Sequence, residues 1–417
     1  MIVVGGAHPT EVGSAHPTEE TVELSDIVAI SAVRTPMGRF GGTLKDIATY
    51  DLGAVAIKAA LERAGVSGDG IDDVNFGSCR QAGNGPNPAR TASVRGGIPV
   101  TVPVQTINMA CPSGMRCIAM SSQAIRLGDC RTAVVGGMDS MSTIPYLLKD
   151  CRWSGFKMGD RTLLDGWADS IDPLCGVGMG ATAENLVDKY KIPREAQDQF
   201  AVESHQKAAT ARSSGWFDEE IVPVEVPAVG RQPAVLFDKD ETIRADTSLE
   251  KMAKLKPVFR KDGTVTAANA CGMSDGATAL VLTSREHAKS LGATPLFSLV
   301  AYSSVAVDPA TMGEGPGLSI PAALKRAGMT LDQMDLIEVN EAFAVQVLAN
   351  EQVLKWDRSK LNVHGGAIAL GHPTGISGAR IVVTLYHALK RTGGELGIAG
   401  ICGGGGVSMA LVIRRET

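Results

Sequence analysis

Cys111 stands in NMACPSGMRC (108–117), directly before a proline, a serine and a glycine. A cysteine that only fills a core usually lies within an apolar run. This one lies between a short apolar segment, 102–108, which predicts a buried strand, and a helical pattern that starts at residue 113. Pro112 suits the first turn of a helix, which places Cys111 at about the N-cap, where unpaired N–H groups and the helix dipole favour a thiolate. The pattern predicts a nucleophilic cysteine at a helix start, with a structural cysteine in a tight turn as the alternative.

An internal duplication supplies partners for Cys111. Residues 57–77 align with residues 320–340 without a gap, at a constant offset of 263 (320 − 57 = 263). Continuing the alignment pairs Cys111 with His372 (372 − 111 = 261), and each of the two precedes a proline that opens a helix. It also places Cys402, within a run of glycines, at the end of a strand. Two related halves that face one another would bring a cysteine, a histidine and a second cysteine together.

The elements that would hold these residues are those of an α/β protein. A strand is expected from residue 26 and an amphipathic helix over 51–66, and strands alternate with helices in each half. The first residues contain AHPTE twice in an acidic context, which indicates a flexible tail. We expect four parts: an N-terminal extension at 1–25, a first half at 26–145 plus about 266–290, an inserted loop domain at 146–265, and a second half at 291–417.

Composition argues against several other classes of function. The net charge is −5 and the sequence pI is about 5.9, which gives no support to nucleic-acid binding on a basic surface. The apolar runs are too short to cross a membrane. The eight cysteines show neither CxxC pairs nor metal-ligand spacing, and no secretory signal precedes them. We therefore expect reduced thiols, no metal site and a cytoplasmic protein.

Four motifs together resemble the thiolase family, which comprises acetyl-CoA C-acetyltransferases and 3-ketoacyl-CoA thiolases. They are NMACPSGM (108–115), VNEAFA (339–344), GGAIALGHPTGISGAR (365–380) and ICGGGGVSMAL (401–411). The resemblance covers nearly the whole chain after residue 26, and it implies two βαβαβαββ halves that form a five-layered α-β-α-β-α core. It also implies coenzyme A and acyl-CoA as cosubstrates with no permanently bound cofactor, and a homodimer or homotetramer. It is also compatible with a partner enzyme of β-oxidation.

The resemblance gives each motif a role. Cys111 is the nucleophile that forms an acyl-thioester, a step that thiolates perform well, and His372 accepts its proton. Cys402 removes or returns the proton at the α-carbon of the acyl-CoA. Charge that develops on the thioester oxygens needs two oxyanion holes. His372 with a water held by Asn340 forms one, and the backbone N–H groups of Cys111 and Gly404 form the other.

Departures from the family pattern concern the substrate more than the reaction. Met179 matches a methionine of the family's acyl pocket, and Phe343 is expected at the substrate site. Gly178 stands where short-chain biosynthetic members carry histidine, which predicts room for an acyl group bulkier than acetoacetyl. Cys271 stands where the family commonly has a serine that contacts the pantetheine, which predicts an altered contact. By contrast, LLKDCRWSGFKMGD (147–160) resembles the loop that joins biosynthetic-type subunits into tetramers.

Two alternatives stay open on the sequence alone. A ketoacyl synthase shares the fold but pairs its cysteine with two histidines, or with a histidine and an asparagine, and has no need of Cys402. An inactive thiolase-like subunit could scaffold a β-oxidation complex, although intact Cys111, His372 and Cys402 argue against it.

Overall fold

The computed structural model describes residues 23–149, 151–153, 155–167, 171–228, 230 and 233–416, so most of the predicted 1–25 extension lies outside the described residues.

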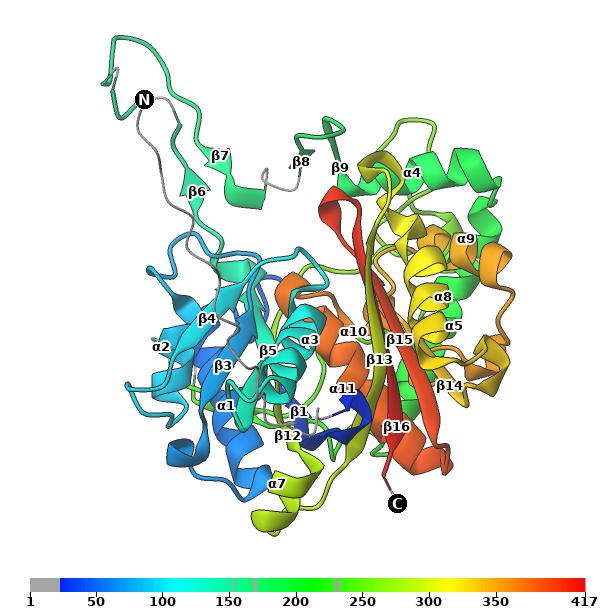
Figure 1. The fold of residues 1–417 in the computed structure, drawn as a ribbon. Helices are drawn as coiled ribbons and strands as arrows, with labels where there is room; N and C mark the ends of the chain where they lie inside the picture. Colours follow the sequence, from blue (N-terminus) through cyan, green and yellow to red (C-terminus); the bar gives the residue numbers. More distant parts are fainter. Residues whose placement is uncertain are drawn as a thin grey trace, which may run out of the picture.

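Ten strands form the central sheet: β1 (Ile27–Arg34), β2 (Gly38–Arg39), β3 (Asp73–Gly77), β4 (Val104–Ile107), β5 (Thr132–Ser140), β12 (Ser274–Ser284), β13 (Phe297–Ala306), β14 (Leu336–Val339), β15 (Leu396–Cys402) and β16 (Val407–Arg415). Their order is β14-β15-β16-β13-β1-β12-β5-β3-β4, with β2 paired to β12 (Figure 1). Because β1 and β13 share only two residue pairs, the sheet consists of two half-sheets joined in the middle.

The predicted duplication is visible in matching helix ends. The helices of the two halves are α1 (Thr49–Ala64), α2 (Pro88–Arg95), α3 (Ser113–Arg126), α8 (Gly315–Ala327), α9 (Ala344–Leu354), α10 (Ala367–Leu370) and α11 (Ser377–Thr392), and α7 (Arg285–Ser290) connects the halves. Helices α1 and α8 both end at a left-handed glycine, Gly65 with φ 65° and Gly328 with φ 66°. Glycine has no Cβ and adopts this left-handed conformation without a steric penalty. The two caps are 263 residues apart (328 − 65 = 263), as the alignment predicts.

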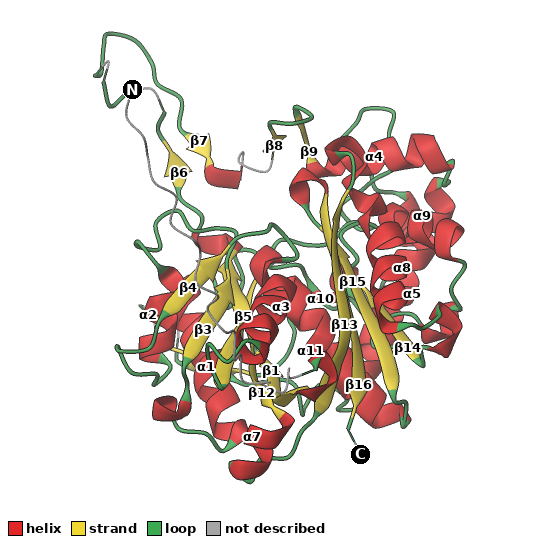
Figure 2. Ribbon diagram, in the orientation of Figure 1, coloured by secondary structure: helices red, strands yellow, loops and turns green. Residues whose placement is uncertain are grey.

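Helices and half-sheets stack in five layers, with α3 and α11 between the two half-sheets (Figure 2). Successive residues of β1 point to opposite faces, so that Ile27 packs in the middle layer with α3 and α11, and Val28 packs against α1. Glycines let the two central helices approach closely. A Cβ on Gly114 would lie 2.9 Å from the Cβ of Ala379, and one on Gly378 would lie 2.8 Å from the backbone nitrogen of Met115. This contact holds the starts of α3 and α11 against one another.

The structure corrects two details of the predicted fold. The 102–108 segment forms a strand, β4, but the strand is only partly buried because it lies at the edge of the sheet. At the equivalent edge of the second half, the chain beside β14 makes only one isolated parallel bridge, Leu361 with Ile337, before the short helix α10. The two halves are therefore related but not identical, and the second half-sheet is one strand shorter.

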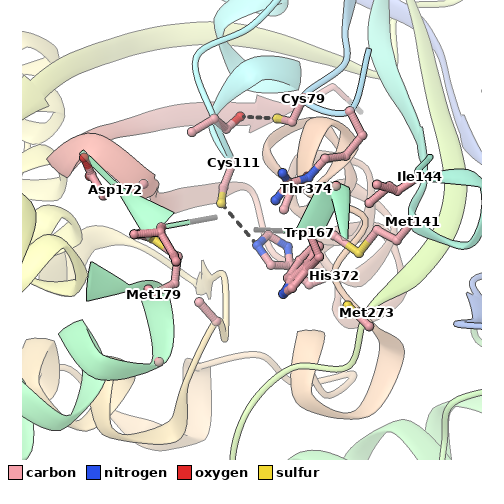
Figure 3. A pocket seen from close by; sticks show the side chains of 18 of the residues that line it. Cys79, Cys111, Met141, Ile144, Trp167, Asp172, Met179, Met273, His372 and Thr374 are labelled. Carbon is pink, nitrogen blue, oxygen red and sulfur yellow. Dashed lines mark hydrogen bonds between the residues drawn. The ribbon is translucent and has the colours of Figure 1, made fainter. Parts of the chain in front are cut away.

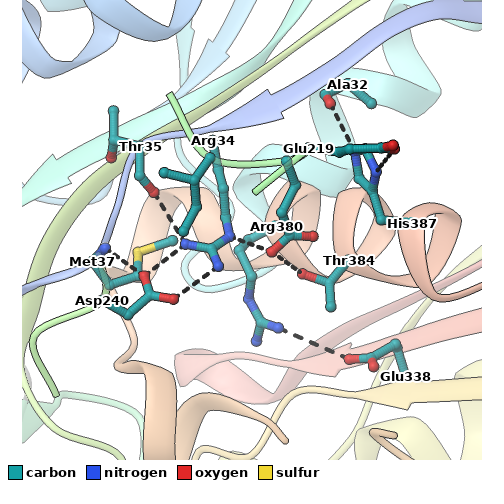
Figure 4. Close-up of polar contacts among 12 residues, drawn as sticks. Ala32, Arg34, Thr35, Met37, Glu219, Asp240, Glu338, Arg380, Thr384 and His387 are labelled. Atoms are coloured by element: carbon teal, nitrogen blue, oxygen red, sulfur yellow. Dashed lines mark hydrogen bonds and ion pairs between the residues drawn. The ribbon is translucent and has the colours of Figure 1, made fainter. Parts of the chain in front are cut away.

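The segment between the halves packs on both of them. It contains β6 (Tyr146–Leu147), β7 (Leu164–Asp165), β8 (Ile171–Asp172), β9 (Val177–Gly178), α4 (Met179–Tyr190), α5 (Arg194–Ser213), β10 (Val224–Val226), β11 (Val235–Phe237) and α6 (Leu249–Ala253). Helices α4 and α5 share a hydrophobic core with α9 of the second half. Arg34, at the end of β1, forms buried ion pairs with Glu220 (2.6 Å) and Asp240 (2.7 Å) of this segment (Figure 4). Breaking such a pair would leave an uncompensated buried charge, so the pairs fix how the segment sits on the first half.

Candidate active site

Cys111 and His372 meet at the base of a cavity of about 950 Å³ (Figure 3). The Nε2 atom of His372 lies 3.3 Å from the Sγ atom of Cys111. Each residue immediately precedes a proline at the start of a central helix, so the packing of α3 against α11 brings the two together. The first helical residue is Ser113 and the N-cap is Pro112, so Cys111, predicted at about the N-cap, lies one residue before it. The predicted meeting of the cysteine and the histidine is therefore present in the structure.

Ser377, the first residue of α11, determines which nitrogen of His372 carries the proton. Its hydroxyl donates its single proton to the carbonyl of Pro373 (2.9 Å) and lies 2.6 Å from the Nδ1 atom of His372. Because the hydroxyl proton is committed to a carbonyl, Nδ1 must donate to Ser377. In the neutral imidazole, Nε2 is then an acceptor. His372 consequently presents a lone pair to the Cys111 thiol.

Both groups of this pair are neutral in the resting site. Burial raises the pKa of Cys111 to about 11, against the opposing effects of the Gly404 N–H and the Arg80 charge. Burial, aided by the charges of Arg380 and Arg80, lowers the pKa of His372 to about 3. The expectation of a resting thiolate at a helix start is thus wrong, because burial outweighs the local backbone dipoles.

The glycine run after β15 lies against the Cys111 turn. The backbone N–H groups of Gly404 and of Cys111 itself both act on the Cys111 sulfur and lower its pKa. Close approach depends on Gly403, where a Cβ would come within 2.6 Å of Pro112 and 3.2 Å of the Cys111 nitrogen. At Gly404 a Cβ would lie 3.2 Å from the sulfur of Met179, at the border of the cavity. Two N–H donors therefore converge beside the thiol, as an oxyanion hole requires.

The residues predicted to bind substrate line the same cavity. They are Gly178, Met179, Cys271 and Phe343. A Cβ placed on Gly178 would meet no atom within 4 Å, so the missing side chain leaves open space there. Phe343 packs edge-to-face against Phe259, which also lines the cavity. Burial raises the pKa of Cys271 to about 12, so this thiol stays protonated.

Two of the predicted site residues lie outside the cavity wall. Cys402, the last residue of β15, is fully buried. Burial is the main cause that raises the pKa of its thiol, and the charge of a nearby Cys111 thiolate would raise it further. Asn340 follows β14 and is fully buried, and neither polar atom of its carboxamide has a partner among the described residues. Buried amides of this kind are satisfied by water or ligand. The structure thus brings Cys402 near Cys111 and leaves Asn340 with unused hydrogen-bonding capacity.

Asp139 is a residue of the site that the sequence analysis missed. This buried carboxylate at the end of β5 accepts from the backbone N–H groups of Cys79, Arg80 and Gly375, and from the hydroxyl of Thr374. It therefore ties the loop after β3 to the loop after His372, across the two halves. An aspartate within the apolar strand pattern of residues 132–140 was the available signal.

Comparison with known proteins identifies the family. Models of the N-terminal and C-terminal thiolase domains match residues 27–286 and 293–415. The chain belongs to the thiolase family. This thiolase is 48% identical to an acetyl-CoA acetyltransferase of Cupriavidus necator, over 94% of this chain and 100% of the relative. It is 46% identical to an acetyl-CoA acetyltransferase of Pseudomonas aeruginosa, over 94% of this chain and 100% of the relative.

Solved structures give the same result. The acetyl-CoA acetyltransferase of Bacillus anthracis matches this thiolase with a TM-score of 0.92 and 45% identity, over 95% of this chain and 100% of that chain. Human mitochondrial 3-ketoacyl-CoA thiolase in complex with CoA matches with a TM-score of 0.91 and 42% identity, over 95% and 100% of the two chains. The predicted family, the thiolase fold and the prediction of an acyltransferase are confirmed.

Two kinds of feature are absent from the described part of the thiolase. No helix in it has the length and apolarity needed to cross a bilayer. No group of three or more His, Cys, Asp or Glu side chains in it is placed to hold a metal ion.

Proposed function

We propose that this thiolase cleaves a 3-ketoacyl-CoA with coenzyme A, or condenses two acyl-CoA molecules in reverse, through an acyl group on Cys111. The observation that carries the proposal is the 3.3 Å contact between the Sγ atom of Cys111 and the Nε2 atom of His372. A thiol with an adjacent base is the arrangement of an activated nucleophile. Since neither a free thiolate nor an imidazolium is favoured in this buried site, the proton moves to His372 as the sulfur–carbon bond forms.

In the cleavage direction, Cys111 attacks the 3-keto carbon. The N–H groups of Cys111 and Gly404 form one oxyanion hole, and His372 with a water held by Asn340 forms the other. When the bond between C2 and C3 breaks, its electron pair leaves on the acetyl-CoA enolate, which takes a proton from Cys402. Acetyl-CoA departs, and the thiol of coenzyme A loses its proton to the Cys402 thiolate and attacks acyl-Cys111. The shortened acyl-CoA leaves, and His372 returns the first proton to Cys111.

The cavity favours a bulky acyl group and a cosubstrate that binds and dissociates in each turnover. A volume of about 950 Å³ and the open space at Gly178 favour a 3-ketoacyl chain larger than acetoacetyl. Cys271, on the cavity wall, takes the place of the serine that contacts pantetheine. Met179 and Phe343 are proposed to contact the acyl chain. The CoA complex of the human relative supports coenzyme A as cosubstrate.

We also propose the four-part division of the chain, with the 146–265 segment providing coenzyme A and subunit contacts. Figure 1 shows the β6–β7 hairpin projecting from the body. Its connecting residues expose large apolar side chains, Trp153 by 95% and Phe156 by 73%. Exposed apolar side chains gathered on a projecting loop mark an interaction site, which supports a homodimer or homotetramer. All eight cysteines are unpaired, which supports a cytoplasmic location. A β-oxidation partner enzyme is proposed to bind on the surface outside the cavity.

The proposal is tested by CoA-dependent thiolysis across 3-ketoacyl-CoA substrates, from acetoacetyl to longer, branched and aromatic chains. We expect cleavage, with the bulkier members preferred over acetoacetyl-CoA. Preference for acetoacetyl-CoA would contradict the role of Gly178 and favour a biosynthetic thiolase. Absence of cleavage across the whole panel, with protein that is folded by circular dichroism, would overturn the proposed reaction.

A further inference from the structure

A turn of four consecutive glycines, Gly403–Gly406, carries one N–H donor of the proposed oxyanion hole. This donor is the backbone N–H of Gly404, which acts on the Cys111 sulfur. The chain itself closes the base of the turn, since the N–H of Gly406 donates to the carbonyl of Gly403 at 3.1 Å. Gly404 and Gly405 lie between these ends, and glycine has more backbone freedom than any other residue. The donor therefore needs a contact from outside the turn to keep its direction.

Asp172, at the end of β8, makes such a contact. Its Oδ2 atom accepts from the backbone N–H of Gly405 at 2.8 Å. This N–H belongs to the planar peptide group that follows Gly404, so holding it restricts the rotation of Gly404 itself. Asp172 is buried, which limits competition from water for the same N–H.

The carboxylate of Asp172 is itself held by its own hairpin, β8–β9. Its Oδ1 atom accepts from the backbone N–H of Leu174 at 2.9 Å. Its backbone carbonyl accepts from the N–H of Gly176 at 2.7 Å, and Asp172 pairs with Val177 across the hairpin. The two side-chain oxygens thus accept from two segments that lie more than 200 residues apart in the sequence. The side chain links the hairpin to the glycine turn.

The same hairpin leads into the wall of the acyl pocket. Gly178 ends β9 and Met179 begins α4, and both residues line the cavity. The Met179 sulfur would lie 3.2 Å from a Cβ on Gly404, so this side chain borders the glycine turn. In Figure 3, Asp172 and Met179 lie to the left of Cys111, and His372 lies to its right. One support therefore serves both the acyl pocket and the donor beside the thiol.

We propose that Asp172 is a positioning residue that holds the Gly404 N–H beside Cys111 and joins this oxyanion hole to the hairpin of the acyl pocket. The inference rests on the proposed thiolase reaction and assigns a residue to its oxyanion hole. Such a donor stabilises the transition state only when it is already aimed at the developing charge. Loss of Asp172 should therefore slow acylation more than it weakens substrate binding.

The test is rapid-quench acylation of Cys111 by acetyl-CoA, measured over a range of acetyl-CoA concentrations. Asp172→Asn keeps the size of the side chain, but its amide has one acceptor oxygen and sets an NH₂ group against the second backbone N–H. The maximal rate should fall roughly 10- to 100-fold, somewhat less than for loss of a whole oxyanion-hole donor, and the half-saturating concentration should change by less than about threefold.

Asp335→Asn is the matched control. The Oδ2 atom of Asp335 also accepts from the backbone of a distant segment, at Glu395 (2.8 Å) and Leu396 (2.9 Å), but Asp335 lies outside the cavity wall. This variant should leave both acylation constants unchanged. The free energy of unfolding in urea is measured for both variants, so that a general loss of stability is separated from an effect on the site.

A second readout is alkylation of Cys111 by iodoacetamide at pH 8, which a purely structural role would not alter. The Gly404 N–H lowers the pKa of Cys111, and the charged residues that act on the same sulfur, Arg80 and Asp139, are unchanged in Asp172→Asn. A displaced Gly404 N–H should slow alkylation roughly two- to tenfold, the effect of a rise in the pKa by up to about one unit. Loss of the Asp172 charge alone would have the opposite effect.

The outcomes separate this role from the proposed reaction. A folded Asp172→Asn protein with wild-type acylation and alkylation rates would overturn the role of Asp172. A raised half-saturating concentration with an unchanged maximal rate would also overturn it, because Asp172 would then shape only the acyl pocket. Faster alkylation would do the same by showing an effect of charge alone. Absence of acylation in the wild type, with alkylation still slower in Asp172→Asn, would overturn the proposed reaction but not the positioning of Gly404.

Discussion

The hydroxyl of Ser377 gives the most specific prediction for the chemistry. It accepts from Nδ1 of His372 at 2.6 Å and donates to the carbonyl of Pro373, so it holds the imidazole with Nε2 free to accept the Cys111 proton. Ser377→Ala removes the acceptor. The Nδ1–H group of the reactive tautomer is then buried without a partner, and the other tautomer, with its proton on Nε2, presents a donor to the thiol.

The size of the effect follows from this lost contact. Leaving a buried donor unsatisfied costs about 1–3 kcal/mol. His372 is 5% exposed, so little water can replace the hydroxyl. If that cost falls on the reactive tautomer, the rate of Cys111 acylation should drop roughly 5- to 150-fold, at about 1.4 kcal/mol for each factor of ten. The dependence of the residual acylation rate on pH should also change, because His372 has lost the Ser377 hydroxyl that holds the proton on Nδ1.

The assay is rapid-quench acylation of Cys111 by acetyl-CoA, with the free energy of unfolding measured in urea for each variant. Ser377→Thr keeps the γ-hydroxyl and should recover most of the rate. Ser319→Ala is the matched control, since it removes another fully buried helix hydroxyl, one that is hydrogen-bonded to Ser408 (3.0 Å) and lies in α8, outside the cavity wall. It should lower stability with little change in acylation. A folded Ser377→Ala protein that acylates at the wild-type rate would refute the tautomer argument.

Three further predictions address other parts of the account. Cys402→Ala should still form acyl-Cys111 but lose condensation by roughly 10²- to 10⁴-fold in a coupled assay, the contribution of a general acid or base; retained condensation would remove Cys402 from the mechanism. Because burial raises the pKa of Cys111 to about 11, its alkylation by iodoacetamide, which needs the thiolate, should rise roughly tenfold for each pH unit between pH 7 and 9. A plateau below pH 8 would mean that the resting thiol is already ionised. Gly378→Ala places a Cβ 2.8 Å from the nitrogen of Met115 and should destabilise the protein by about 1–3 kcal/mol in urea unfolding, so an unchanged midpoint would contradict the close packing of α3 against α11.

The duplication made much of the fold predictable. A constant offset between two segments fixed the relation of the halves, and the observed glycine caps at Gly65 and Gly328 follow it. Because equivalent helix starts face one another across a pseudo-twofold axis, the meeting of Cys111 with His372 could be predicted without coordinates. The equivalence ends where local sequence differs, since the second half has only an isolated bridge at Leu361 where the first half has β4.

Properties that depend on many distant residues could not be predicted in the same way. The ionisation state of Cys111 is one example, because burial is a sum over several elements whereas the dipole argument uses only one turn. The role of Ser377 depends on where a single hydroxyl proton goes, which the sequence pattern does not contain. Asp139 joins loops more than 200 residues apart, since it contacts both Cys79 and Gly375. A charged residue in an apolar strand could have indicated that such a contact exists, but not which loops it joins.

The central claim, an acyl group carried on Cys111, is tested most directly by trapping it. The wild-type protein is mixed with acetyl-CoA, quenched in acid within milliseconds and digested, and the acetylated peptide is identified by mass spectrometry. We predict one acetyl group per chain, located on Cys111, which disappears when coenzyme A is added before the quench, and no acetylation in Cys111→Ala. Thiolysis that proceeds with no acetyl group on Cys111, or with the acetyl group on another residue, would contradict the account.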